Sequence, residues 1–173
     1  MIIVCPLSRL AETVSTHGAQ RVISLLGEPK LLIRPPGVRE ADHLYLEVHD
    51  IAEPCDGQIL CGAEHIDTVL AFVRAWDQAA PLVVHCWAGI SRSTAVAFLA
   101  ACALQPGRDE DDIAQALRAA SPTAYPNRRI VALGDEVLGR GGRMVAAVEA
   151  IGRGSPADEG RPFALPLEAP RAA

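Results

Sequence analysis

The residues with the clearest chemical potential are Cys86 and Arg92, with Gly89 between them and Ser93 directly after the arginine. A cysteine thiolate is a strong nucleophile, and the planar guanidinium of arginine can hold two oxygens of a tetrahedral anion side by side. A serine hydroxyl near the sulfur can donate a hydrogen bond that stabilises the thiolate when it leaves a covalent intermediate. This combination predicts attack of the Cys86 sulfur on a bound oxyanion.

Two apolar segments must position these side chains. Residues 82–84 form a short apolar run, which predicts a central strand of a mostly parallel sheet. Residues 95–104 are apolar on all sides and predict a buried helix. Cys86 therefore opens a strand-to-helix loop, and Arg92 lies in the first turn of the helix. Backbone N–H groups converge in such a loop and favour a bound oxyanion.

The pattern His85-Cys86-x-x-Gly89-x-x-Arg92-Ser93 resembles the signature of the cysteine-dependent protein tyrosine phosphatase superfamily, most closely its dual-specificity branch, of bacterial type. The resemblance implies a single α/β domain with a central, mostly parallel sheet of four to five strands flanked by helices. His85 is expected to orient the loop. The resemblance also implies that phosphate is bound by Trp87, Ala88, Gly89, Ile90, Ser91 and Arg92.

Phosphate ester cleavage also needs a proton donor for the departing alcohol or phenol. The polar loop 49–57 follows a predicted strand and carries two candidates, Asp50 and Asp56. In dual-specificity phosphatases the acid is an aspartate just after a strand of this kind. Tyr45-Leu46-x-Val48-x-Asp50 resembles that lead-in, so we assign the general acid and base to Asp50. Asp56 is the alternative, and in a third interpretation both are ordinary loop or capping carboxylates.

Three further residues are candidates for supporting roles. The pair Pro126-Asn127 resembles the proline-asparagine that follows the active site in many dual-specificity enzymes, where the asparagine steadies the phosphate loop. Asn127 is otherwise a helix N-cap. Cys55 and Cys61 lie on the acid loop, so either could trap oxidised Cys86 as a disulfide.

The strands expected besides 82–84 are residues 1–5, 21–26 and 43–48, with a brief additional strand at 31–33. Helices are expected over residues 7–16, 62–79 and 144–151. Two more are expected between these last two: one begins at residue 109, and the other follows the loop 121–129 and ends at residue 138. The acidic run 109–112 suits a helix N-terminus better than a metal site.

Composition and length limit the class of protein. With 173 residues, of which 50% are hydrophobic, we expect one catalytic domain over residues 1–152 and a disordered or loosely attached tail, rich in proline and glycine, over residues 153–173. A net charge of −5 gives no sign of a nucleic-acid or membrane partner. No apolar run is long enough to span a bilayer and no signal peptide is evident, so we expect a soluble, cytoplasmic protein and a monomer.

The sequence thus predicts a phosphatase without cofactor or metal that acts on phosphorylated proteins or small phosphate monoesters, above all on phosphotyrosine and also on phosphoserine or phosphothreonine. Cys86 would form the phosphocysteine, Arg92 would bind phosphate and Asp50 would transfer protons. Three alternatives stay open: a non-catalytic phospho-binding module, an inositol-phosphate phosphatase and a rhodanese-type sulfurtransferase. The uncharged loop residues Trp87 and Ile90 make an inositol phosphate less favoured, because such enzymes often carry lysines there.

Overall fold

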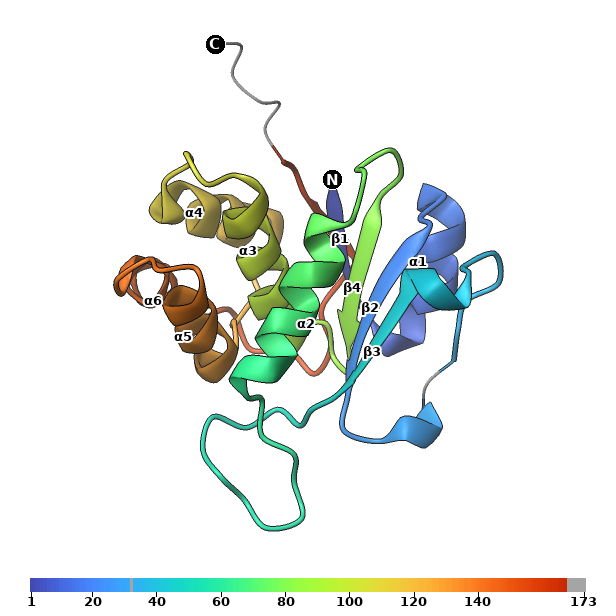
Figure 1. The fold of residues 1–173 in the computed structure, drawn as a ribbon, viewed down its shortest axis with the longest axis horizontal. Coiled ribbons are helices and arrows are strands. Elements are labelled where there is room, and N and C mark those ends of the chain that lie inside the picture. The colour runs from blue at the N-terminus through green and yellow to red at the C-terminus, as the bar shows by residue number, and fades with distance from the viewer. Residues whose placement is uncertain (32, 168–173) are drawn as a thin grey trace.

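A five-stranded sheet runs through the computed structural model, which describes residues 1–31 and 33–167 (Figure 1). Its strand order is β3-β2-β4-β1-β5, and all neighbours are parallel except the antiparallel pair β1 and β5. The strands are β1 (Ile2–Pro6), β2 (Arg21–Leu26), β3 (His43–Glu47), β4 (Leu82–Cys86) and β5 (Phe163–Leu165). The expected α/β class with a mostly parallel sheet of four to five strands is confirmed.

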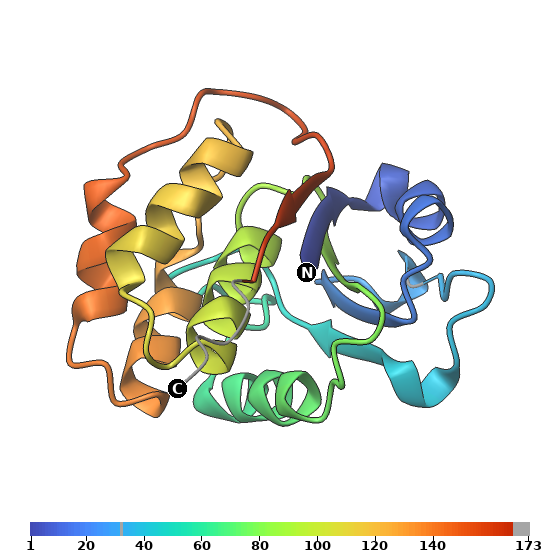
Figure 2. The same cartoon turned by 90° about the horizontal axis from the view of Figure 1, so that it is seen from above.

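Helices cover both faces of the sheet, one on the first face and five on the second (Figure 2). The α-helices are α1 (Leu10–His17), α2 (Ala63–Arg74), α3 (Arg92–Leu104), α4 (Glu110–Ala120), α5 (Arg128–Val137) and α6 (Arg143–Ala150). Short 3-10 turns are η1 (Leu7–Arg9), η2 (Pro29–Leu31) and η3 (Glu40–Asp42). No helix in the described part of the chain is both long and apolar enough to cross a bilayer.

The alternation of side chains along the strands creates two cores. Ile3 and Cys5 of β1 pack with Leu10 and Val14 of α1 on one face. Ile2 and the other strand residues that point the opposite way pack against α2 to α6. The strands β1, β2 and β4 are therefore buried on both faces, which explains their mostly apolar sequences, whereas β3 and β5 at the edges of the sheet are only partly buried.

Helix α3 lies at the centre of the larger core, between the sheet and the outer helices. Its residues from Arg92 to Cys102 are all buried, and it contacts α2, α4, α5, β1 and β4. Burying a side chain such as Phe98 or Leu99 contributes roughly 1.5–3 kcal/mol to stability. This burial accounts for an apolar surface on every side of the helix and fixes the direction in which Arg92 leaves the first turn.

Two expectations about the edges of the fold are wrong. The brief strand at residues 31–33 does not form at Leu31, which ends the 3-10 turn η2; residue 32 lies outside the described residues. The surrounding prolines, at positions 29, 35 and 36, remove backbone donors that a strand would use.

The expectation of a disordered or loosely attached tail is wrong for residues 163–165. These residues form β5 beside β1, with Ile2 opposite Leu165, and the Leu165 side chain is fully buried. The strand is too short and too close to prolines to be evident from pattern alone, and β1 supplies its pairing partner from the other end of the chain. Residues 153–162 are also described, and the N–H groups of Ser155 and Gly160 donate to the carbonyl oxygens of Pro122 and Ala88; residues 168–173 lie outside the described residues.

Candidate active site

The loop between β4 and α3 begins directly after Cys86 and ends at Arg92. Gly89 has a φ of +69°, and a Cβ atom there would lie 2.7 Å from the backbone nitrogen of Pro6. Only glycine fits this left-handed position against the end of β1. The glycine therefore lets the loop turn tightly beside the neighbouring strand.

Surrounding segments bind the carbonyl groups of this loop. The backbone N–H groups of Leu7, Gly160 and Tyr125 donate to the carbonyl oxygens of residues 87, 88 and 90 at 3.1, 2.8 and 2.9 Å. The N–H groups of residues 88–91 have no hydrogen-bond acceptor in the described part of the chain. With the carbonyls held outward, these donors are available to an anion, as in other anion-binding backbone loops.

The candidate nucleophile lies at the base of the loop. Cys86 Sγ is 3.1 Å from Ser93 Oγ, and both side chains are almost completely buried. Because Cys86 ends β4 and Ser93 is in the first turn of α3, the two elements fix this contact. When the sulfur is a thiolate, the serine hydroxyl is the donor.

The guanidinium of Arg92 lies between a backbone carbonyl and the Asp50 carboxylate. Its Nη1 donates to the carbonyl oxygen of Val48 at 2.9 Å. Its Nε is buried and has no hydrogen-bond acceptor among the described residues, while Asp50 Oδ2 is 3.8 Å away. A buried charged donor without an acceptor is costly, so the site is suited to receive an oxyanion.

Asp50 lies in the segment after β3 and reaches the loop between β4 and α3, residues 87–91, which we call the phosphate loop. Its Oδ1 accepts hydrogen bonds from the Ser91 hydroxyl at 2.7 Å and from Asn127 Nδ2 at 2.8 Å. The side chain is 38% exposed, so its other oxygen can be reached by a substrate. The carboxyl group therefore lies over the loop with one oxygen held and one available.

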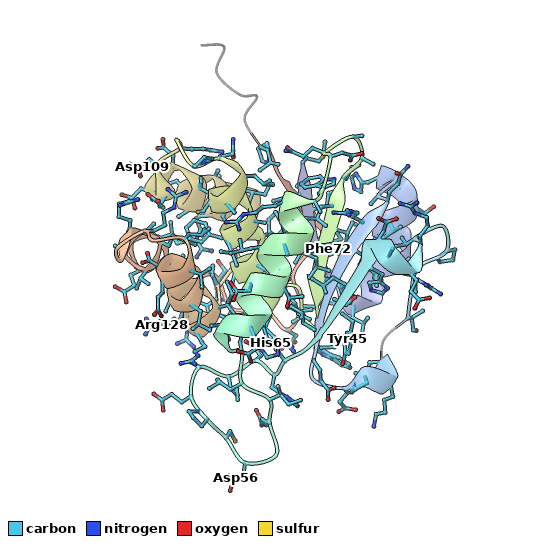
Figure 3. The ribbon with its side chains drawn as sticks, viewed as in Figure 1. Tyr45, Asp56, His65, Phe72, Asp109 and Arg128 are labelled. Atoms are coloured by element: carbon cyan, nitrogen blue, oxygen red, sulfur yellow. The ribbon has the colours of Figure 1, made fainter. Side chains whose placement is uncertain are left out.

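Asp56, the alternative acid, lies elsewhere. Figure 3 shows it at the tip of the loop after β3, pointing away from the body of the molecule. It is exposed and makes no hydrogen bond or ion pair within residues 1–31 and 33–167. The structure thus brings only Asp50 of the two candidates to the phosphate loop.

Asn127 makes hydrogen bonds of both kinds that the two alternatives from the sequence require. Its Oδ1 accepts from the N–H groups of Arg129 and Ile130 at 3.0 and 3.2 Å, which caps α5. Its Nδ2 donates to Asp50, and its backbone N–H donates to the Ser91 carbonyl at 3.3 Å. One side chain therefore ties the start of α5 to the candidate acid.

His85 lies beneath the loop in a buried polar chain that crosses three strands. Its Nε2 is 2.6 Å from Ser24 Oγ on β2, which in turn is 2.7 Å from His43 Nε2 on β3. Burial lowers the pKa of His85 to about 4 and also lowers the pKa of His43. The neutral ring of His85 is therefore fixed directly before the nucleophile.

Sequence reasoning missed Ser24, His43 and Thr94. The Thr94 hydroxyl donates to the Ser91 carbonyl at 2.9 Å and so helps to hold the loop. The available signal for Ser24 was a lone polar residue within an apolar strand, which needs a buried partner. No local pattern indicates that His43 is that partner.

The other cysteines differ sharply in environment. Burial raises the pKa of Cys5 to about 12 and that of Cys61 to about 11, so both are protonated thiols at neutral pH. Cys55 is exposed, and the five cysteines are all free thiols. A redox role for Cys55 or Cys61 toward Cys86 stays a prediction.

Comparison with known proteins agrees with this geometry. Residues 58–122, which include β4, the loop and α3, match the family described as protein-tyrosine phosphatase. The structure resembles that of DUSP15, with a TM-score of 0.64, 18% identity and coverage of 87% of this chain and 89% of that one. No curated protein matches the sequence.

Two further solved structures are similar. For human DUSP28 the TM-score is 0.62, with 20% identity over 80% of this chain and 92% of that chain. For a mouse putative dual specificity phosphatase the TM-score is 0.60, with 21% identity over 87% of this chain and 86% of that chain. The fold is therefore that of the dual-specificity phosphatases. The match to the protein-tyrosine phosphatase family covers residues 58–122, and the likeness in fold extends over most of the chain.

Proposed function

We propose that the chain hydrolyses phosphate monoesters on proteins, above all phosphotyrosine, through a phosphocysteine on Cys86. The observation that carries the proposal is the phosphate loop itself. Its N–H groups at residues 88–91 are unpaired in the described part of the chain, and the buried Arg92 Nε likewise has no acceptor there. We expect these donors to bind the oxygens of a phosphoryl group next to the Cys86 sulfur.

In the first step the Cys86 thiolate attacks phosphorus in line, and the bond between phosphorus and the ester oxygen breaks. The loop N–H groups and Arg92 hold the equatorial oxygens, so catalysis depends on positioning and electrostatic stabilisation. Asp50 gives its proton to the departing ester oxygen, which leaves as an alcohol or phenol. The available oxygen, Oδ2, is suited to this transfer because Oδ1 is already bound by Ser91 and Asn127.

In the second step a water molecule attacks the phosphocysteine. The Asp50 carboxylate takes a proton from the water, the bond between sulfur and phosphorus breaks, and inorganic phosphate is released. The departing thiolate receives the hydrogen bond of the Ser93 hydroxyl, whose oxygen lies 3.1 Å from the sulfur. Asp50 is then protonated again and ready to act as the acid in the next cycle.

The rival functions explain less of the site. A non-catalytic phospho-binding module would need the loop but would not need a carboxyl group held over it by two hydrogen bonds. A sulfurtransferase would leave Asp50 unexplained. The loop residues Trp87, Ala88 and Ile90 offer no cation to a polyphosphorylated inositol.

The test is phosphate release from a panel of phosphotyrosine, phosphoserine and phosphothreonine peptides and soluble inositol phosphates. We expect turnover of the phosphotyrosine peptides, inhibition by vanadate, and binding without turnover in Cys86→Ser. Full activity of Cys86→Ser would refute the mechanism. Transfer of sulfur from thiosulfate to cyanide, with no phosphate release, would instead identify a sulfurtransferase.

A further inference from the structure

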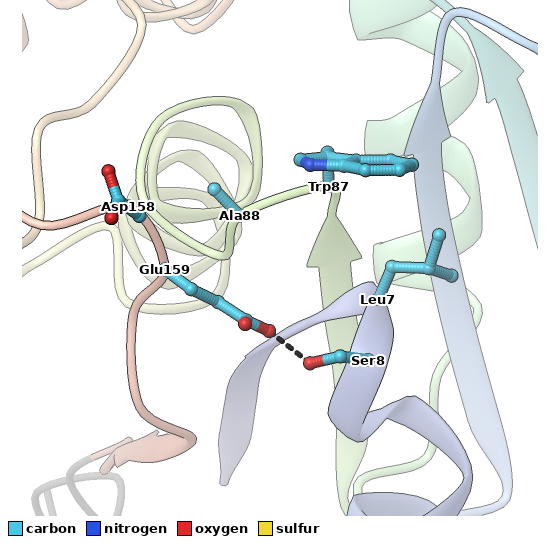
Figure 4. A pocket seen from close by; sticks show the side chains of 6 residues that line it. All are labelled: Leu7, Ser8, Trp87, Ala88, Asp158 and Glu159. Atoms are coloured by element: carbon cyan, nitrogen blue, oxygen red, sulfur yellow. Dashed lines mark hydrogen bonds between the residues drawn. The ribbon is translucent and has the colours of Figure 1, made fainter.

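A pocket of about 420 Å³ lies directly beside the phosphate loop (Figure 4). It shares Trp87 and Ala88 with the loop, so whatever occupies it lies next to the substrate's phosphoryl group. The remaining walls come from both ends of the chain. They are Leu7 and Ser8 after β1, and Asp158 and Glu159 in the segment that leads to β5.

One side of the pocket is apolar. The Trp87 side chain is 59% exposed although it directly follows the buried Cys86. Figure 4 shows the indole ring above Leu7, and the Leu7 N–H donates to the Trp87 carbonyl oxygen at 3.1 Å, which fixes their backbones relative to each other. A large exposed aromatic face beside a site for chemistry is a suitable surface for a ligand.

The other side of the pocket is acidic. Glu159 accepts a hydrogen bond from the Ser8 hydroxyl, so its carboxylate is fixed against the opposite wall of the pocket. The adjacent Gly160 N–H donates to the Ala88 carbonyl at 2.8 Å, which fixes this segment to the phosphate loop. Within the described residues neither Asp158 nor Glu159 forms an ion pair. Two carboxylates therefore line the same pocket as the Trp87 ring, and neither has a cationic partner within the described residues.

We infer that this pocket is a substrate subsite for an arginine or lysine side chain close to the phosphorylated residue of a protein substrate. The inference rests on the proposed function, because the substrate must carry both groups. The aliphatic stem would lie along Trp87 and Leu7, as long basic side chains do on apolar surfaces, and the cation would meet the two carboxylates. The same carboxylates disfavour an acidic residue or a second phosphate at this position.

The experiment uses phosphotyrosine peptides that carry one arginine, moved through the positions on either side of the phosphorylated residue. Each peptide has two partners, one with citrulline, the neutral isostere, and one with glutamate. At one position we expect kcat/KM for arginine to exceed that for citrulline about fivefold, the combined size of a partly exposed ion pair and a cation–π contact. The ratio should fall at high salt.

Variants assign the preference to the pocket. Asp158→Asn should lower the ratio of arginine to citrulline, and the double variant with Glu159→Gln should bring it to about twofold, the part that a cation–π contact with Trp87 supplies. Asp158 serves first because, unlike Glu159, it makes no hydrogen bond to Ser8. The matched control is Asp67→Asn, an exposed carboxylate on α2, which should keep the wild-type ratio. Since the readout is a ratio within one variant, a general loss of activity does not obscure it.

The outcomes separate this inference from the proposed function. Equal kcat/KM for arginine and citrulline at every position, or a preference of undiminished size in the double variant, would overturn the subsite and leave the phosphatase intact. If no phosphopeptide is hydrolysed, calorimetry with Cys86→Ser still compares the affinities of the two peptides. Tighter binding of arginine would then support the subsite while the proposed function fails, and equal binding would overturn both.

Discussion

A 2.7 Å hydrogen bond joins the hydroxyl of Ser91 to the carboxylate of Asp50, although the two residues are 41 positions apart in the chain. This contact fixes the segment after β3 to the phosphate loop at the end of β4. It leaves the second carboxylate oxygen free of hydrogen bonds and near Arg92. The proposed acid is therefore held in place before any substrate binds.

Asp50→Asn should separate substrates by their leaving groups. The amide oxygen can still accept from Ser91 and Asn127, so the loop keeps its position, but the side chain cannot supply a proton. We expect kcat for phenyl phosphate to fall about 10²–10⁴-fold, the usual contribution of general acid catalysis, and kcat for para-nitrophenyl phosphate to fall much less. Asp56→Asn is the matched control and should behave as wild type. Equal losses on both esters, or a larger loss in the Asp56 variant, would contradict the assignment.

Ser93→Ala should slow breakdown of the phosphocysteine more than its formation. The variant removes the hydroxyl that lies 3.1 Å from the sulfur. A hydrogen bond to a charged group is worth about 1.5–3 kcal/mol, so the second step should be about 10- to 100-fold slower. Stopped-flow measurement should then show a burst of para-nitrophenol followed by a slow steady rate. Ser155→Ala, on an exposed serine, should show the wild-type time course; a Ser93→Ala variant without a burst and with unchanged kcat would refute this role.

Two substitutions should separate the roles of Asn127. Asn127→Ala loses both the cap of α5 and the bond to Asp50, so we expect a loss of about 1 kcal/mol in the free energy of unfolding together with lower kcat. Asn127→Ser can still cap the helix but is too short to hold Asp50. It should keep most of the stability and still lose activity. If stability and activity change in parallel in both variants, Asn127 acts only as a cap.

Gly160→Ala should disturb the phosphate loop from outside. A Cβ atom at this position would lie 3.0 Å from the Gly89 carbonyl oxygen and 3.4 Å from that of Ala88. Such overpacking against backbone costs about 1–3 kcal/mol, and we expect weaker binding of vanadate as the loop shifts. Gly107→Ala is the control, because nothing lies within 4 Å of its Cβ position. Unchanged vanadate affinity and stability in Gly160→Ala would show that the loop does not depend on this contact.

Acid should destabilise the fold through His85. Burial lowers the pKa of this ring from an ordinary 6.5 to about 4, so the unfolded chain binds the proton at a higher pH than the folded chain does. The free energy of unfolding should therefore fall as the pH falls from about 6.5 to about 4, by an amount on the order of 3 kcal/mol from this group. His43 acts in the same direction, because burial lowers its pKa too. Urea unfolding in this pH range should show a shallower dependence for His85→Asn, and an unchanged dependence would contradict the assignment.

The central part of the fold could be predicted because its signals are local. The apolar run at residues 82–84 and the apolar helix after Arg92 follow each other directly, so sequence spacing alone puts Cys86 and Arg92 on one loop. The preference for Asp50 over Asp56 depended on a resemblance, since both carboxylates lie on the same polar segment. Their separation in space comes from contacts that Asp50 makes with Ser91 and Asn127.

The parts that sequence did not predict depend on contacts between distant segments. The strand β5 has only three residues, and its stability comes from pairing with β1 at the opposite end of the chain. Gly160 closes on the phosphate loop for the same reason, because the strand pairing brings its segment there. The chain of His43, Ser24 and His85 likewise requires three strands to lie side by side. Periodicity and composition contain no information on such pairings.

The most direct test of the account is to trap the phosphoryl group on the enzyme. Wild type and Ser93→Ala are mixed with a phosphotyrosine peptide labelled on phosphorus and denatured within milliseconds, at a pH where a bond between sulfur and phosphorus persists. The proteolytic fragments are then mapped by mass spectrometry. We expect a phosphoryl group on Cys86, at higher occupancy in Ser93→Ala and absent from Cys86→Ser. Turnover without label on Cys86, or label on another residue, would contradict it.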